Sequence, residues 1–219
     1  MRKRGKNMGW LFVLKRFHPW VWLMRFRHRR GYGVHSPFAF HLITAVIYET
    51  TPYYKYKELN VQQRLLKREK GFEWAYAETT KVKRMLFRLA NWARPMCIVD
   101  AGPDSAAELF LKGARIKAVY LKWTEGKLEQ WLKDRKVDFL YLHGIYAVER
   151  LWNVFDQLAE RTTQQSVFVI EGIGYSSAMK GLWERVKSDE RVGISFDLYD
   201  VGIVCFDRTR FKQHYIVNF

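Results

Sequence analysis

One turn in the sequence combines a carboxylate with a glycine, a combination that suits the binding of a nucleotide-like ligand. Residues 100–106 read Asp-Ala-Gly-Pro-Asp-Ser-Ala, after a short apolar run and before an apolar helical pattern. A turn between a strand and a helix offers backbone amides to a ligand, and a nearby acid can bind the ligand's polar groups. Asp100, Gly102 and Ser105 are therefore candidate cofactor-binding residues. In the alternative interpretation the turn is only a tight connection, and Asp104 or Ser105 caps the helix that follows.

A second group of polar side chains follows two later apolar runs, at residues 137–142 and 166–170. The group consists of His143, Tyr146, Glu171 and Tyr175. The carboxyl ends of neighbouring parallel strands form the usual mouth of such a sheet, so these side chains are expected to lie close together. His143 and Glu171 are candidate catalytic bases. The alternative is a polar rim of loops that carries no chemistry.

Short strands that alternate with helices are expected to position both groups. Strands are predicted at 97–100, 118–121, 137–142 and 166–170, and helices at 106–112, 128–133, 148–160 and 178–187. This alternation predicts a parallel sheet with helices on both faces. Two closely spaced runs, 194–199 and 202–206, predict an antiparallel C-terminal hairpin, which residues 214–219 extend. The fold class is therefore α/β, a Rossmann-like domain over residues 96–219.

Residues 31–95 form a predicted helical region ahead of this domain. Ser36 and Pro37 suit the N-cap and the first position of a helix over 37–49. Further helices are predicted over 59–70 and 80–92 from their apolar spacing.

The formal net charge of +16 at pH 7 lies entirely in the first 95 residues. These residues hold 21 Lys or Arg against 5 Asp or Glu, whereas residues 96–219 hold 17 of each kind. Such a split predicts a neutral globular domain joined to a basic segment that faces phosphates. The two cysteines, Cys97 and Cys205, fall in predicted strands and are expected to be buried and unpaired, as in a reducing intracellular setting.

Residues 1–30 form a basic, aromatic, amphipathic arm with ten Lys or Arg and no acid. Lys15, Arg16 and His18-Pro19 interrupt its apolar runs, which argues against a secretory signal and against a membrane-spanning helix. One hypothesis is peripheral contact with an anionic membrane surface, where Trp and Phe enter the interface. The alternatives are RNA binding, or aromatic residues that cap the domain's own core. The expected location is the cytoplasm, at the inner face of the membrane under the first hypothesis.

Three stretches of the chain together resemble a known family. They are Gly33-Val34-His35-Ser36-Pro37-Phe38, the helical Leu86-Phe87-Arg88-Leu89, and the tail formed by residues 202–206 and 213–219. From about residue 31 onward, the chain resembles a bacterial group of class I S-adenosylmethionine-dependent methyltransferase-like proteins, most familiar from the Bacteroidota. The resemblance implies a cofactor, S-adenosylmethionine, at the carboxyl ends of the first strands and methyl transfer to an unidentified acceptor. It also makes His35 a candidate to fold over the cofactor, although a loop histidine bonded to backbone is the alternative.

The chain departs from the family's pattern at several positions. The departures are Ala106 for the later glycine of the turn, Lys122-Trp123 for the acid that grips the ribose, His143-Gly144 for an Asp-Gly pair, and Glu171-Gly172 for an acidic pair. Because paired carboxylates are missing, no metal site is predicted. The short stretch between Ile98 and Phe139 also predicts a sheet shortened by about one strand.

Two functions remain open from the sequence. The first is an S-adenosylmethionine-dependent methyltransferase with Asp100 and Gly102 at the cofactor and His143 or Glu171 as base. The second is a non-catalytic descendant of the same fold, whose basic arm binds an anionic membrane surface or nucleic acid.

Overall fold

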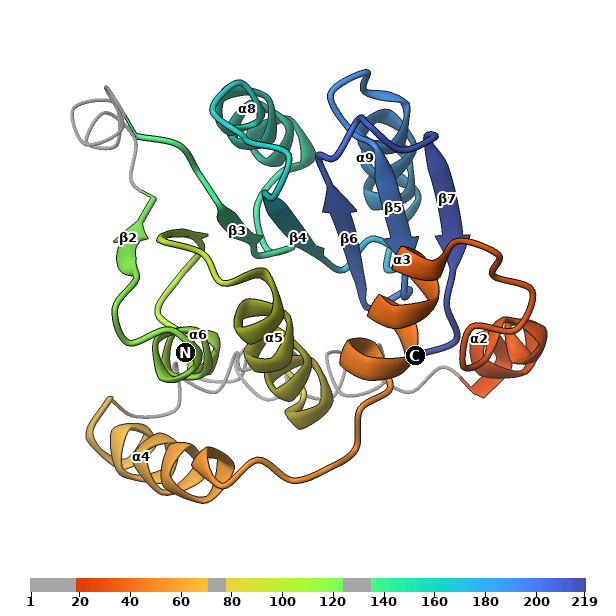
Figure 1. The fold of residues 1–219 in the computed structure, drawn as a ribbon. Coiled ribbons are helices and arrows are strands. Elements are labelled where there is room, and N and C mark those ends of the chain that lie inside the picture. Colours follow the sequence, from red (N-terminus) through yellow and green to blue (C-terminus); the bar gives the residue numbers. More distant parts are fainter. Residues whose placement is uncertain (1–18, 71–77, 124–134) are drawn as a thin grey trace, which may run out of the picture.

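A seven-stranded sheet forms the centre of the computed structural model, which describes residues 19–70, 78–123 and 135–219 (Figure 1). The strand order is β2-β1-β3-β4-β6-β5-β7. The strands are β1 (Cys97–Ala101), β2 (Val119–Lys122), β3 (Phe139–Leu142), β4 (Val167–Glu171), β5 (Ile194–Asp197), β6 (Val201–Cys205) and β7 (Gln213–Ile216). All neighbouring strands are parallel except the two pairs that involve β6. The predicted Rossmann-like sheet with an antiparallel C-terminal hairpin is therefore confirmed.

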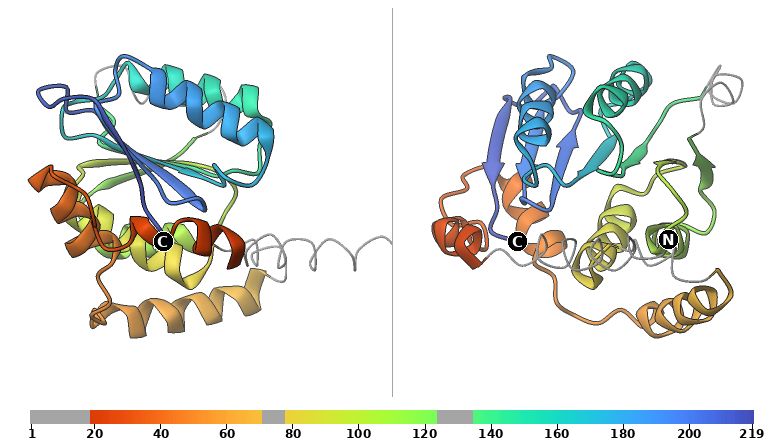
Figure 2. Two further views of the ribbon diagram at one scale, coloured as in Figure 1. Left: turned by 90° about the vertical axis from the view of Figure 1, so that its right-hand side faces the viewer. Right: turned by 180° about the vertical axis from the view of Figure 1, so that it is seen from behind.

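Helices cover both faces of the sheet, as Figure 2 shows from the side. One face carries α8 (Val148–Ala159) and α9 (Ser177–Ser188). The other carries α3 (Pro37–His41), η2 (Leu42–Ile47), α5 (Thr80–Ala93) and α6 (Ala106–Ala114), with α4 (Lys55–Lys70) packed outside α6. The short elements α2 (Pro19–Met24) and η1 (Phe26–His28) lie beside the C-terminal end of the chain.

The central strands are apolar along their whole length because both of their faces are buried. In β3, Phe139 and Tyr141 belong to the core beneath α5 and α6, whereas Leu140 and Leu142 belong to the core beneath α8 and α9. Successive side chains of a strand point to opposite faces, so a strand covered on both sides reads as a continuous apolar run. This pattern explains why β1, β3 and β4 were predictable.

The helix predicted over residues 37–49 is split into an α-helical and a π-helical part. Ser36 Oγ accepts a hydrogen bond from the amide of Ala39 at 3.3 Å, so the predicted N-cap is confirmed. The π-helical part ends where the buried Arg88 donates hydrogen bonds to the carbonyls of Val46 (2.6 Å) and Ile47 (2.9 Å). A side chain more than forty residues away therefore satisfies backbone groups that this helix end leaves open.

The edge of the sheet beyond β1 holds one strand, β2, within the described residues. No further strand follows β2 before β3 in the parts of this connection that the structure describes, and the predicted helix at 128–133 lies outside the described residues. The sheet instead gains β7 at its opposite edge, beside β5. None of the described helices has the length and apolar character that crossing a membrane requires.

Candidate functional site

A cluster of buried and half-buried polar side chains lies where β1, β2 and β3 end. This carboxyl-edge cluster consists of Glu78, Asp100, Tyr120, Lys122 and His143. Asp100 stands near the end of β1, Tyr120 and Lys122 share one face of β2, and His143 directly follows β3. Asp100 is 0% exposed and His143 is 2% exposed. The strands thus bring together polar groups that lie far apart in the sequence.

Asp100 is the centre of the cluster, and both of its carboxylate oxygens are engaged. Oδ1 lies 2.8 Å from His143 Nε2, and Oδ2 lies 2.8 Å from the ammonium of Lys122. The hydroxyl of Tyr120 also donates to Oδ2. Both carboxylate oxygens of Asp100 are therefore bound by side chains of the same protein.

Lys122 also closes the turn that follows β1. Its ammonium donates hydrogen bonds to the carbonyls of Pro103 (2.8 Å) and Gly102 (3.4 Å), and it lies 3.9 Å from Asp104. The cation at the end of β2 thus spans the whole candidate cofactor turn.

Glu78 lies on the other side of His143, just ahead of α5. Its Oε1 is 3.6 Å from His143 Nδ1 and accepts hydrogen bonds from Ser105 (2.8 Å) and Tyr141 (3.4 Å). Its Oε2 is buried without a hydrogen-bond partner among the described residues. The imidazole therefore lies between two buried carboxylates, and Ser105 joins the cluster through Glu78 while its Oγ also caps α6.

Electrostatics hold Asp100 and His143 as a charged pair. Burial opposes ionisation of Asp100, but the hydrogen bond and charge of His143, followed by those of Lys122, outweigh it and lower the pKa of Asp100. Burial likewise opposes charge on His143, yet the hydrogen bond and charge of Asp100, helped by Glu78 and Glu171, raise the pKa of His143. The pKa of Tyr120 is raised, first by burial and then by the charge of Asp100, so Tyr120 keeps its proton and donates a hydrogen bond to Asp100.

The space above Gly102 is filled by His143. A Cβ atom at residue 102 would lie 2.0 Å from Cδ2 of the imidazole, far inside van der Waals contact. Glycine is therefore required at this position for the approach of a side chain of the same protein. The sequence interpretation assigned that role to a ligand.

The other predicted site residues make contacts of their own. Glu171 ends β4, and its Oε2 accepts a hydrogen bond from the amide of Gly144 at 3.4 Å. The hydroxyl of Tyr175 donates to Asp200 at 3.1 Å. Tyr146 lies under the guanidinium of Arg150, 4.3 Å from its ring centroid. Only His143, of the four side chains expected to form an acid–base group, makes contact with Asp100.

His35 is exposed, and the structure does not bring it to the carboxyl edge. Three residues further on, Phe38 packs against Trp92 and lies under the guanidinium of Arg210. Trp92 precedes β1 and Arg210 precedes β7. This contact therefore lies at the amino ends of the parallel strands, opposite their carboxyl ends. His35 therefore does not cover the candidate cofactor turn, because α3 holds the motif at the amino ends of the strands.

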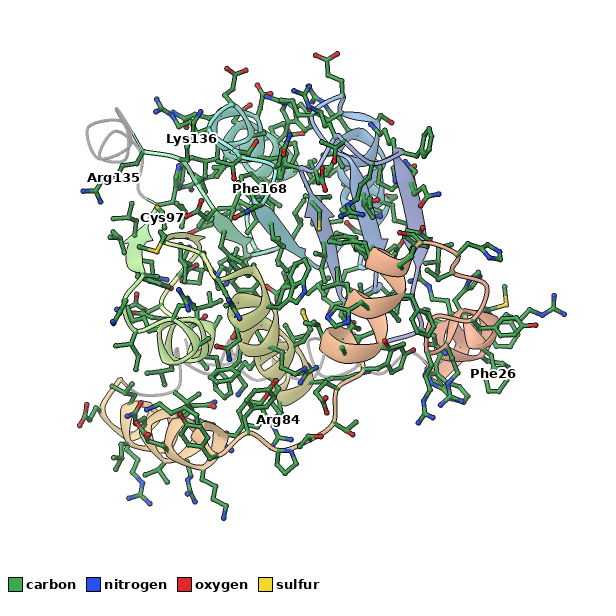
Figure 3. All side chains as sticks on the ribbon, in the orientation of Figure 1. Phe26, Arg84, Cys97, Arg135, Lys136 and Phe168 are labelled. Atoms are coloured by element: carbon green, nitrogen blue, oxygen red, sulfur yellow. The ribbon has the colours of Figure 1, made fainter. Side chains whose placement is uncertain are left out.

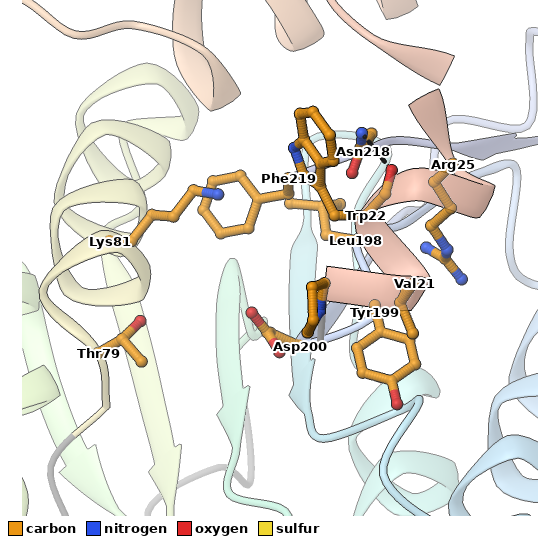
Figure 4. A pocket seen from close by; sticks show the side chains of 11 residues that line it. Val21, Trp22, Arg25, Thr79, Lys81, Leu198, Tyr199, Asp200, Asn218 and Phe219 are labelled. Carbon is orange, nitrogen blue, oxygen red and sulfur yellow. Dashed lines mark hydrogen bonds between the residues drawn. The ribbon is translucent and has the colours of Figure 1, made fainter. Parts of the chain in front are cut away.

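A cavity of about 490 Å³ lies further along the carboxyl edge, between α2, the start of α5 and the turn joining β5 to β6 (Figure 4). Lys81 enters it and places its ammonium 4.0 Å from the ring centroid of Phe219. Burial lowers the pKa of Lys81 more than the charge of Asp200 raises it. The rest of the lining comes from Pro19, Val21, Trp22, Arg25, Thr79, Leu198, Tyr199 and Asn218. Its walls are mainly apolar, and it is separate from the carboxyl-edge cluster.

The chemistry available to the cluster is limited by its burial. A general base must come within hydrogen-bond reach of the proton that it removes from a substrate. His143 has both ring nitrogens directed at carboxylates and is almost wholly buried. In the described parts of the chain, no group of three or more His, Cys, Asp or Glu is arranged to hold a metal ion. The cluster is therefore arranged as an internal ionic network.

Sequence reasoning missed Glu78, Tyr120 and Tyr141 as members of this network. Glu78 is one of five acids in the first 95 residues, and it precedes the N-cap Thr79, a position with no motif of its own. The spacing of Tyr120 and Lys122 on one strand face is a usable signal, because residues two apart in a strand point the same way. This spacing does not by itself identify the partner of Lys122. The partner becomes clear only when β1 is known to lie beside β2.

Comparison with known proteins supports the fold. No protein-family model and no curated protein sequence matches the chain. Among solved structures, a methyltransferase from Geobacter sulfurreducens has 10% identity and a TM-score of 0.50, and the match covers 75% of this chain and 96% of that one. An SAH-bound methyltransferase from Podospora anserina has 11% identity and a TM-score of 0.53, with 72% and 98% covered. At this level of identity the likeness concerns architecture: the chain has the α/β fold of these S-adenosylmethionine-dependent methyltransferases.

Proposed function

We propose that this chain is a non-catalytic protein built on the methyltransferase fold, a binding protein whose cofactor mouth is closed by its own side chains. The observation that carries the proposal is the pairing of Asp100 with both Lys122 and His143 at 2.8 Å. The resemblance of the sequence and the likeness of the fold support descent from methyltransferases. The contacts at the carboxyl edge oppose retention of the activity.

The residues at the turn do not fit S-adenosylmethionine. This cofactor carries an ammonium and a sulfonium as well as one carboxylate, and a site for it must offer acceptors or negative charge to the two positive groups. Three acceptors at the turn, the carboxylate of Asp100 and the carbonyls of Gly102 and Pro103, already accept hydrogen bonds from the ammonium of Lys122. A further cation beside Lys122 and His143 would meet like charges in a region shielded from water, where charge repulsion is strong.

The end of β2 gives a second reason. A ribose is commonly held there by a carboxylate that accepts hydrogen bonds from its hydroxyls. Here the strand ends in Lys122, and Trp123 packs against the core beneath α8. An ammonium has donors only, so it cannot accept the hydrogen bonds of a ribose.

Isothermal titration calorimetry tests the proposal directly. The purified full chain is titrated with S-adenosylmethionine and with S-adenosylhomocysteine, and a methyltransferase known to bind both serves as positive control. We expect no binding heat and no rise in Tm at about 1 mM ligand, since a ligand at 100 times its Kd would stabilise the fold by about 2.7 kcal/mol. A dissociation constant below about 100 μM for either ligand would overturn the proposal.

The second candidate is S-adenosylmethionine-dependent methyl transfer to an unidentified acceptor. It is favoured by the position of Asp100 and Gly102 at the first strand-to-helix turn and by the SAH-bound state of the Podospora anserina structure. In that case the cofactor would supply the methyl group, and His143 or Glu171 would act as base. The Lys122→Met variant distinguishes the candidates, because removing the internal cation would allow the cofactor to bind if only Lys122 excludes it. Binding by the wild type, in contrast, favours the enzyme.

A further inference from the structure

Five large apolar side chains are exposed on the segment formed by α2 and η1. Trp20 is 70% exposed, Trp22 46%, Leu23 56%, Met24 69% and Phe26 51%. Figure 3 shows Phe26 at the outer side of this segment, away from the sheet. Single exposed apolar residues are common, but five within seven positions form an apolar surface of the kind that marks an interaction site.

The inner side of the same segment is fixed to the body of the protein. Arg25 forms an ion pair with Asp197 at 2.7 Å, and its guanidinium lies over the ring of Tyr199. Asn218 makes two hydrogen bonds to the segment, both at 3.0 Å. Its side-chain Nδ2 donates to the carbonyl of Trp22, and its backbone N–H donates to the carbonyl of His28. These contacts set the orientation of the helix, so its apolar side cannot turn toward the core.

Cations accompany the apolar patch. Arg27 and Arg30 are exposed, and Arg29 lies over the rings of Trp22 and Phe26 at 5.3 and 5.2 Å from their centroids. No Asp or Glu occurs anywhere in residues 1–48. The surface is therefore both apolar and positively charged, which complements a partner that is apolar beneath a layer of negative charge.

We infer that this surface, formed by Trp20, Leu23, Met24, Phe26, Arg27 and Arg30 and called the docking surface below, binds the face of an anionic lipid bilayer. Trp and Phe enter the interfacial zone, the aliphatic side chains reach the acyl boundary, and the arginines pair with lipid phosphates. A single-stranded RNA is a poorer fit, because Leu23 and Met24 offer no ring for base stacking. Docking does not depend on whether the carboxyl edge binds a cofactor.

Vesicle flotation with the full chain tests this inference. Vesicles of neutral phosphatidylcholine are compared with vesicles that also contain phosphatidylglycerol, at low and high salt. We expect wild-type protein to float with the anionic vesicles and to be released by salt. Two variants target the docking surface: Trp20→Ser/Leu23→Ser/Met24→Ser removes apolar contact, and Arg27→Gln/Arg30→Gln removes charge. The second variant should weaken binding about 25-fold, since each basic residue near an anionic surface contributes about fivefold.

Matched controls carry the same kinds of substitution elsewhere on the surface. Tyr54→Ser/Ile116→Ser/Phe211→Ser replaces three side chains that are 89%, 80% and 90% exposed, and Lys117→Gln/Arg208→Gln removes two exposed cations. Circular dichroism confirms that each variant is folded. Equal loss of flotation in controls and docking variants, or no flotation of the wild type, would overturn the inference. So would salt-sensitive binding to a single-stranded RNA that the docking variants abolish while vesicle binding stays unchanged.

Discussion

The carboxylates around His143 favour its protonated form, and this preference makes stability depend on pH. Its folded pKa is raised above the ordinary value of 6.5. The ion pair with Asp100 therefore contributes fully to the free energy of unfolding below about pH 6.5, the pKa of a histidine in the unfolded chain. The contribution is lost as the pH rises through the higher folded value.

We predict that His143→Gln lowers the free energy of unfolding most at about pH 6 and progressively less toward pH 9. Breaking a buried charge pair costs about 3–5 kcal/mol, and urea unfolding at a series of pH values measures it. His214→Gln is the control, because the pKa of His214 is lowered, by burial and then by Lys187 and Lys212. The small loss of unfolding free energy that His214→Gln causes should grow, and not shrink, as the pH rises. A penalty for His143→Gln that is the same at every pH would contradict a charged imidazole.

The sequence identified Asp100, Gly102 and His143 at one edge of the sheet, but it could not reveal what they do there. The local sequence of Asp100 and Gly102 is the same whether Asp100 binds a cofactor or a histidine 43 positions later. The partner of Asp100 depends on strand register, which pairs Asp100 with Lys122 and with Tyr141. Register is a property of the folded sheet and is not readable from a local motif.

At the scale of elements, the prediction was most accurate where burial is complete. Strands buried on both faces and helices with one apolar face have clear periodicities. The helix over 37–49 was predicted as a single α-helix, and its π-helical second half was not, because Arg88 on α5 determines how its last carbonyls are satisfied. Contacts between distant elements leave no local pattern in the sequence.

We predict that Arg88→Met destabilises the protein by about 2–4 kcal/mol, since two buried carbonyls lose their charged donor. Chemical denaturation of the full chain measures the loss. Arg64→Met on α4 is the matched control, because Arg64 is exposed and Met and Arg have similar helix propensity. The control should change stability by less than about 0.5 kcal/mol. Similar losses in both variants would show that Arg88 does not support the end of η2.

At the scale of the whole molecule, the helical region and the sheet share one core. Side chains from η2, α5 and five of the seven strands belong to the same apolar cluster. The domain is therefore expected to unfold as a unit, and the two cysteines report on this. Cys97 lies in β1 and Cys205 in β6, both buried and unpaired, as predicted from the sequence.

We predict that both thiols react only slowly with a disulfide reagent in the native protein at pH 8. Burial, aided by nearby Asp138, raises the pKa of Cys97 to about 11, and burial with Asp207 raises that of Cys205 to about 12, so thiolate is scarce as well as inaccessible. Both should react at one common rate, at least about 10³-fold slower than in guanidinium. Rapid reaction of Cys97 with Cys205 protected would instead show that the β1–β2 edge opens separately.

The bond from Lys122 to Asp100 has a consequence for how the protein responds to its surroundings. An enzyme that binds a cofactor gains stability in proportion to the logarithm of the cofactor's concentration, so its folded population follows the metabolite pool. Lys122, in contrast, belongs to the same chain as Asp100. Its effective concentration at Asp100 is therefore fixed when the chain folds. If the chain is the non-catalytic protein proposed above, the carboxyl edge is saturated from the moment of folding, and its stability does not depend on the cell's supply of methyl donor.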